Sequence, residues 1–161
     1  MGKRRAAREM AVQMLYQVDL GESTLPAIFS SFDLGEYLAE PLGRDPAARR
    51  EAAERRRQEI DEAFAHAREL VEGAHAHRAE IDALIREQAD NWRLERMPPV
   101  DRNILRLAIY EMLHETDVPK LVVVDEAIEL AKKFGSEHSG RFVNGLLDGL
   151  LKAHSFPGSL K

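Results

Sequence analysis

The amino-acid sequence predicts an all-α protein, and three observations support this fold class. Apolar residues recur at the 3.6-residue spacing of helices along most of the chain. The one strand-like run, residues 121–124 (LVVV), has no second strand to pair with elsewhere. The stretch from Pro98 to Leu151 contains a segment so apolar that it must be a helix enclosed by neighbours. The 161 residues suffice for one domain, or for two small helical subdomains with a shared core.

The first predicted helix covers residues 4–20 and has two distinct faces. Its apolar face consists of Ala7, Met10, Ala11, Met14, Leu15 and Val18. Its polar face consists of Arg5, Arg8, Glu9, Gln13, Tyr16 and Gln17. The two sets lie on opposite sides of a helical wheel, so we expect the first to be buried and the second to face solvent. Gly21 ends the helix.

A short second helix is expected next. Ser23 or Thr24 can cap it, and Pro26 suits its first turn because that position needs no N–H donor. Gly35 and Gly43 interrupt the segment that follows, so this helix has little room to extend.

Two longer helices are expected between residues 45 and 92. The first begins at Asp45, whose side chain can cap it, and runs to about Ala76. Its first half mixes charges of both signs, which is typical of a solvated helix, and an apolar stripe begins only at Ile60. The second runs from about Arg78 to Trp92, with Trp92 directed inward.

The hub of the chain is a helix expected to start at Asp101, with that aspartate as its N-cap. Its apolar residues cover most of the wheel: Ile104, Leu105, Leu107, Ala108, Ile109, Met112 and Leu113. Such a helix needs packing partners on several sides, so we expect the other helices to surround it.

Two more helices complete the chain. One continues from residues 121–124 to Phe134, with Gly135 as its C-cap. The last begins near Ser139 and has an apolar face formed by Phe142, Val143, Leu146, Leu147, Leu150 and Leu151. Residues 154–161 include Pro157 and Gly158 and are expected to form a frayed, flexible tail.

Composition excludes several classes of protein. No apolar run is long enough to cross a bilayer, and no secretory leader pattern is present, so we expect a cytoplasmic protein with no membrane association. The chain has no cysteine, which rules out disulfides and thiolate metal sites. The net charge of −5 argues against nucleic-acid binding through bulk charge, so any such binding must be local. Basic residues do gather locally, at Lys3, Arg4, Arg5 and Arg8.

Tyr16 is the most specific candidate for a binding residue. On the wheel it lies within roughly 20° of Arg5 and Glu9, on the charged face of the first helix. An aromatic side chain there can stack on an unpaired base while arginines hold phosphates, as in single-stranded RNA recognition. The alternative is that Tyr16 lies partly under another helix and that the arginines are simply solvated.

A carboxylate-bridged dimetal oxidoreductase is the alternative function from a different class. Glu72 with His75, and Glu111 with His114, have the i, i+3 spacing of helical di-iron proteins. Both pairs lie at helix ends and lack two further inward glutamates, which favours ordinary surface residues. His75 and His77 as a mononuclear site lack companions at ligand spacing. No catalytic nucleophile motif or phosphate-binding loop is present, and the segment 135–139 is expected to be a turn between helices.

Three stretches together resemble one known family. They are residues 4–20 (RRAAREMAVQMLYQVDL), 100–113 (VDRNILRLAIYEML) and 117–148 (DVPKLVVVDEAIELAKKFGSEHSGRFVNGLLD). In this order they resemble the NusB family of bacterial transcription antitermination factors, and the resemblance covers nearly the whole chain. It implies a single NusB-like domain, residues 1–161, of about seven helices in two small packed bundles. The bundles would be residues 1–97 and 98–153, followed by the flexible tail.

The resemblance also implies a function without catalysis, cofactor or metal. Family members bind the boxA element of ribosomal RNA transcripts together with NusE, a small-subunit ribosomal protein, in the antitermination complex on RNA polymerase. The positions that match the family's RNA-contacting residues are Arg4, Arg5, Arg8 and Tyr16, with Phe142 and Asn144 at the edge of that surface. Two departures from the family pattern are Ala6, which interrupts a run of arginines, and a longer charged stretch at residues 40–59. Relatives occur both alone and as self-pairs, so the resemblance is compatible with either a monomer or a homodimer.

Overall fold

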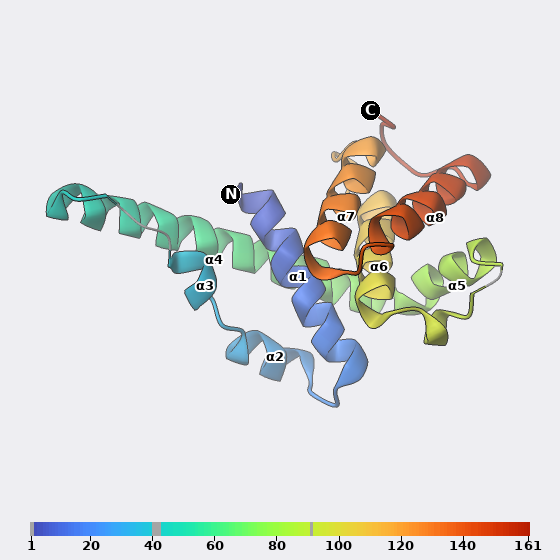
Figure 1. Ribbon diagram of the computed structural model, residues 1–161, viewed down its shortest axis with the longest axis horizontal. Helices are drawn as coiled ribbons and strands as arrows, with labels where there is room; N and C mark the ends of the chain where they lie inside the picture. Colours follow the sequence, from blue (N-terminus) through green and yellow to red (C-terminus); the bar gives the residue numbers. More distant parts are fainter. Residues whose placement is uncertain (1, 40–42, 91) are drawn as a thin grey trace.

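The computed structural model describes residues 2–39, 43–90 and 92–161, and all regular structure in these ranges is helical (Figure 1). The elements are α1 (Lys3–Leu20), α2 (Leu25–Ser31), α3 (Gly35–Leu38), α4 (Pro46–Ala76), α5 (Arg78–Gln88), the 3-10 helix η1 (Leu94–Arg96), α6 (Pro99–His114), α7 (Lys120–Phe134) and α8 (Ser139–Ala153). The predicted all-α class is confirmed. The strand-like run 121–124 forms the first turn of α7, as predicted.

Helix α6 is the hub of the fold, as the sequence predicts. It contacts α1, α4, α5, α7 and α8, which surround it in Figure 1. Ile104, Leu105, Ile109 and Met112 have no exposed surface. Burying each such side chain contributes roughly 1.5–3 kcal/mol, so the contacts around α6 are a major source of stability. The buried side chains of all these helices form one continuous core.

Helix α1 is more deeply buried than its wheel predicts. It packs against α4 on one side and α6 on another, so part of its polar face is also covered. Arg8 and Glu9, which were expected to face solvent, are buried. Glu9 accepts hydrogen bonds from Lys133 Nζ of α7 (2.8 Å) and from the Tyr37 hydroxyl of α3 (3.4 Å). Burial of Tyr37, together with the negative charge of Glu9, raises the pKa of its hydroxyl.

The start of α6 differs from the prediction. The helix begins at Pro99, two residues before the expected cap, because proline fits the first turn of a helix. Asp101 is therefore inside the helix and does not cap it. Its buried carboxylate instead accepts a hydrogen bond from Ser139 Oγ (2.7 Å), which ties α6 to the start of α8.

The prediction that Trp92 lies inward is wrong. Helix α5 ends at Gln88, so Trp92 is not on its inner face and is 54% exposed. Its ring lies edge-on to Phe142 of α8, with 6.0 Å between centroids. The early end of α5 thus places an aromatic pair at the surface between the end of α5 and α8.

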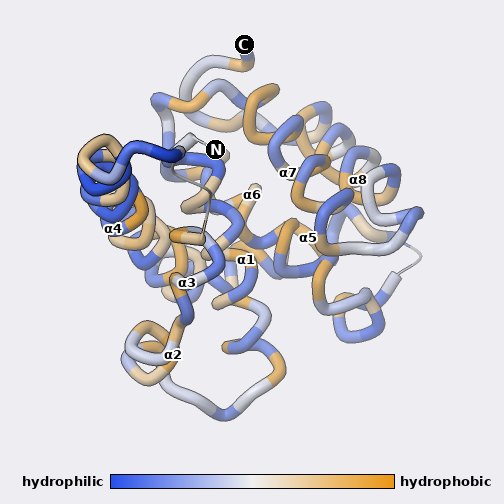
Figure 2. The backbone as a smooth tube through the Cα atoms, turned by 60° about the vertical axis from the view of Figure 1, so that its left-hand side comes forward, coloured by the Kyte–Doolittle hydropathy of each residue, from blue (hydrophilic) through white to orange (hydrophobic). Residues whose placement is uncertain are grey.

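Helix α4 begins as predicted, with Asp45 accepting a hydrogen bond from the Ala48 N–H. Its N-terminal part extends beyond the rest of the bundle (Figure 1), and residues 46–59 are mostly exposed. Of the charged stretch 40–59, residues 40–42 lie outside the described residues. Figure 2 shows hydrophilic and hydrophobic positions alternating along the helices, as expected where each helix buries one side. Residues 46–59 thus form the largely solvated N-terminal part of one long helix.

The C-terminal segment is held in place where the sequence predicts a frayed tail. The Lys120 N–H donates to the Ser159 carbonyl (3.0 Å), and the Leu121 N–H donates to the Leu160 carbonyl (2.8 Å). These are N–H groups of the first turn of α7, which have no partner within the helix. Because Pro119 at the N-cap has no side-chain acceptor, the tail supplies the missing carbonyls.

Candidate nucleic-acid interface

The N-terminal arginines of α1 are exposed but are paired with carboxylates. Arg5 donates two hydrogen bonds to Glu126 of α7, at 3.1 and 2.9 Å. This contact lowers the pKa of the Glu126 carboxyl despite its partial burial. Arg4 Nη2 lies 3.7 Å from Asp117. A phosphate that binds here must therefore compete with Glu126 and Asp117 for these guanidinium groups.

Arg8 is not part of the exposed surface. Its side chain reaches into the interior and donates three hydrogen bonds of 2.9–3.1 Å to both carboxylate oxygens of Glu111 on α6. Only 6% of the residue is exposed. The expectation that Arg8 contacts RNA is therefore corrected, because α6 covers the part of α1 that the wheel left open. Arg8 instead joins α1 to α6 through a bidentate ion pair.

Tyr16 lies in a shallow groove between α1, α6 and α7. The groove is lined by Val12, Gln13, Tyr16, Gln17, Val100 and Phe134. Tyr16 is 38% exposed, and Val100 of α6 and Phe134 of α7 line the same groove. The side chain is therefore partly covered and partly accessible to solvent.

A second groove begins where the first ends. Phe134 lines the first groove, and the next residue, Gly135, lines the second. The second groove lies between α7 and α8, and its polar lining includes Lys132, Ser136, Glu137, Arg141 and Asn144. Asn144, which the sequence places at the edge of the predicted RNA surface, lines this second groove.

Phe142 is directed away from Asn144. Two residues on a helix are separated by about 200°, so the two side chains lie on different sides of α8. Phe142 is half-buried and packs on Trp92, in a third hollow that Gln88 and Arg141 also line. Arg141 lines both hollows and is the link between Phe142 and the Asn144 groove.

Four residues beyond those predicted from the sequence belong to the same surface: Lys132, Lys133, Phe134 and Arg141. Lys132 and Lys133 lie in the last turn of α7, and Phe134, its last residue, lines the Tyr16 groove. Lys133 Nζ lies 5.6 Å from the centroid of the Phe134 ring. In the sequence, the two adjacent lysines followed by a phenylalanine are the pattern from which this part of the surface could have been predicted. We call the surface formed by Arg4, Arg5, Tyr16, Lys132, Lys133, Phe134, Arg141 and Asn144 the α1/α7/α8 face.

The residues of the dimetal alternative do not form such a site. Both oxygens of Glu111 are hydrogen-bonded to Arg8, so this carboxylate cannot bridge two metals without breaking a buried ion pair. Glu72 and His75 are exposed at the end of α4. His114 stacks on Tyr110 and on His77 at the α4–α5 junction.

Fold and surface together define a class: a helical protein with open grooves and an exposed face of basic, aromatic and amide side chains. Within the described ranges, no helix has the length and apolarity needed to cross a membrane. The chain belongs to the NusB family, whose family model matches residues 5–152.

Individual relatives cover nearly the same range. The chain is 44% identical to the transcription antitermination protein NusB of Myxococcus xanthus (strain DK1622), over 98% of this chain and 100% of that protein. Identity to the NusB protein of Sorangium cellulosum (strain So ce56) is 43%, over 92% and 91% of the two chains. The family assignment that the motifs suggested is thereby confirmed.

Solved structures share the fold. A structure of T. maritima NusB has a TM-score of 0.68 and 35% identity, and the match covers 94% of this chain and 92% of that one. A crystal structure of the antitermination factors NusB and NusE in complex with dsRNA has a TM-score of 0.65 and 28% identity, covering 94% and 98%.

Proposed function

We propose that this chain is a non-enzymatic RNA-binding adaptor in transcription antitermination, which binds boxA RNA of ribosomal RNA operons together with NusE. The observation that carries this proposal is the α1/α7/α8 face, where the partly exposed Tyr16 lines a groove with Phe134, and Lys133 Nζ lies 5.6 Å from the Phe134 ring centroid. An aromatic surface flanked by cations suits unpaired bases and their phosphates. The related complex of NusB and NusE with RNA supports the same pair of partners.

Binding to RNA alone should be weak and sensitive to salt. Arg5 and Lys133 are paired with Glu126 and Glu9, so phosphates replace existing ion pairs rather than neutralise free charges. Only a few phosphate contacts are available on this face, and each adds to the salt dependence. NusE, and beyond it the antitermination complex on RNA polymerase in the cytoplasm, would add affinity by holding the RNA close to this face. A homodimer that covered the face would compete with RNA.

Titration of boxA-like RNA at about 50 mM and about 200 mM salt, with and without NusE, tests the proposal. Tyr16→Ala should weaken binding about 5-fold to 100-fold, the effect of losing one stacked base, whereas Tyr16→Phe should keep most of the affinity. Arg5→Ala should weaken binding and reduce the slope of log affinity against log salt by about one.

Arg86→Ala is the matched control for Arg5→Ala. Arg86 is also an exposed arginine in an ion pair, 3.0 Å from Glu95, but it lies on α5 and outside the α1/α7/α8 face. Its substitution should leave RNA affinity unchanged. If Arg5→Ala and Tyr16→Ala bind RNA as tightly as Arg86→Ala does, the face is not the RNA site.

A further inference from the structure

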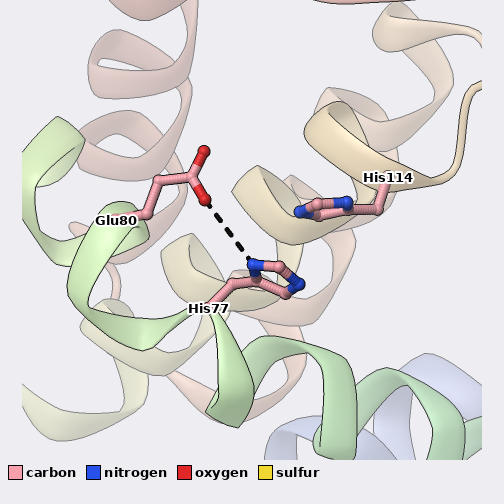
Figure 3. Close-up of side chains that lie close together, drawn as sticks. All are labelled: His77, Glu80 and His114. Atoms are coloured by element: carbon pink, nitrogen blue, oxygen red, sulfur yellow. Dashed lines mark ion pairs between the residues drawn. The ribbon is translucent and has the colours of Figure 1, made fainter.

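The α4–α5 corner and the end of α6 bring two histidines and a glutamate together. His77 lies between α4 and α5, Glu80 is in the first turn of α5, and His114 is the last residue of α6. Figure 3 shows the three side chains directed toward a common space, with an ion pair between His77 Nδ1 and Glu80 Oε2 (3.6 Å). One ligand atom from each residue lies within 4.8 Å of the other two.

We propose that His77, Glu80 and His114 form a binding site for a divalent transition metal ion such as Zn²⁺. Two imidazoles and a carboxylate are a common ligand set for zinc, and a water completes four-coordination. With metal–ligand distances of about 2.0–2.2 Å, neighbouring ligand atoms of a tetrahedral site are about 3.4 Å apart. The three ligand atoms, which now lie within 4.8 Å of one another, must therefore move closer to one another by about 1.4 Å at most. Glu80 and His114 are exposed, so rotation of their side chains can close this distance.

The backbone and the aromatic neighbours position the two imidazoles. His77 is the C-cap of α4, and its backbone N–H donates to the Gly73 carbonyl (3.0 Å). Tyr110 stacks on His114 with 5.0 Å between centroids, and the two histidine rings lie 4.2 Å apart. Tyr110 can sit this close to α4 only because residue 73 is glycine: a Cβ there would lie 2.2 Å from the tyrosine hydroxyl. The ligands thus rest on a packed aromatic support.

The local electrostatic field favours a cation. Two helices, α4 and α6, end at this cluster, at Ala76 and His114, and one helix, α5, begins there at Arg78, so two partial negative charges meet one partial positive charge. Glu80 adds a full negative charge. A bound ion would join the α4–α5 corner to the end of α6 and stabilise the folded state.

Calorimetric titration of Zn²⁺ into the untagged, metal-free full chain tests this site. We expect one equivalent to bind and the melting temperature to rise in its presence. His77→Ala and His114→Ala should each weaken binding at least tenfold. His75→Ala is the matched control, because His75 is an exposed histidine two residues from His77 that does not belong to the cluster, and it should bind zinc as the unsubstituted chain does.

Two further measurements distinguish ligation from loss of folding. Glu80→Gln keeps the shape of an exposed side chain but removes its charge, so it should weaken zinc binding without changing the far-UV circular dichroism spectrum. Co²⁺ should give the visible absorption of a four-coordinate ion, and excess Mg²⁺ should not displace it. The proposal would be overturned if the full chain does not bind zinc. It would also be overturned if His77→Ala and His114→Ala bind zinc as tightly as His75→Ala does.

Discussion

Arg5 and Arg8 lie less than one helical turn apart on α1, yet the structure uses them in opposite ways. Arg5 lies at the surface, half exposed, with Glu126 as its partner. Arg8 lies under α6, and Nε and Nη2 of its guanidinium donate to Glu111. A wheel places both residues on the polar face. The comparison teaches that the number of helices around α1, rather than its own pattern, decides which charge remains available to a ligand.

Arg8→Ala should produce the largest effect in this comparison. It leaves the Glu111 carboxylate buried without its partner, and breaking a buried ion pair in this way costs about 3–5 kcal/mol. Urea unfolding should show this loss. Replacing both residues, as Arg8→Met with Glu111→Leu, should recover most of the stability, because no buried charge remains unpaired. A loss well below about 1 kcal/mol in Arg8→Ala would mean that α1 and α6 do not depend on this pair.

Asp19→Asn should have the next largest effect and should change the response to acid. The Asp19 side chain, near the end of α1, is only 5% exposed, which by itself would raise the pKa of its carboxyl; hydrogen bonds from Arg102 and Asn103 and the charge of Arg106 outweigh this and lower the pKa. The substitution removes charge-assisted hydrogen bonds, with an expected cost on the order of 2 kcal/mol at neutral pH.

The sign of the pH effect follows from the lowered pKa. An aspartate with a folded-state pKa below its unfolded value stabilises the protein above the unfolded value, about 3.9, and this contribution is lost as pH falls through the folded pKa. The difference in unfolding free energy between the unsubstituted chain and Asp19→Asn should therefore be full at pH 7 and shrink below about pH 4. Urea unfolding of both proteins at pH 7 and below about pH 4 measures this difference in unfolding free energy. A constant difference would contradict the assignment.

Arg5→Ala should have little effect on the melting temperature, in contrast to Arg8→Ala. Solvent screens the Arg5–Glu126 pair, and exposed ion pairs contribute little to stability. Thermal unfolding followed by circular dichroism measures the shift. A melting temperature as low as that of Arg8→Ala would show that the two pairs are not different in kind.

Arg4→Ala should have the smallest effect. Arg4 and Asp117 are both largely exposed and lie 3.7 Å apart, too far for a strong hydrogen bond. The melting temperature should not change measurably at about 0.15 M salt. A clear shift would indicate that the start of α1 is held more firmly than this contact implies.

Much of the fold could be predicted because local patterns carry it. Asp45 with Pro46 marked the start of α4, and Gly135 marked the end of α7, since both positions depend on the backbone of their own segment. Of the residues predicted to contact RNA, Arg5 and Tyr16 are at least partly exposed and Asn144 lines a groove, whereas Arg8 is buried against α6. Phe142 packs on Trp92 instead, because α5 ends early and brings that ring to α8.

The sequence by itself determined the helices, the apolar hub and the family, since helical periodicity, caps and motifs are properties of neighbouring residues. Only the tertiary structure decided which charges are buried and which distant side chains meet. The pairing of Arg8 with Glu111 spans 103 positions, and the cluster of His77 with His114 joins the ends of two helices. Such contacts depend on how the helices cross around α6, and no local pattern in the chain encodes that geometry.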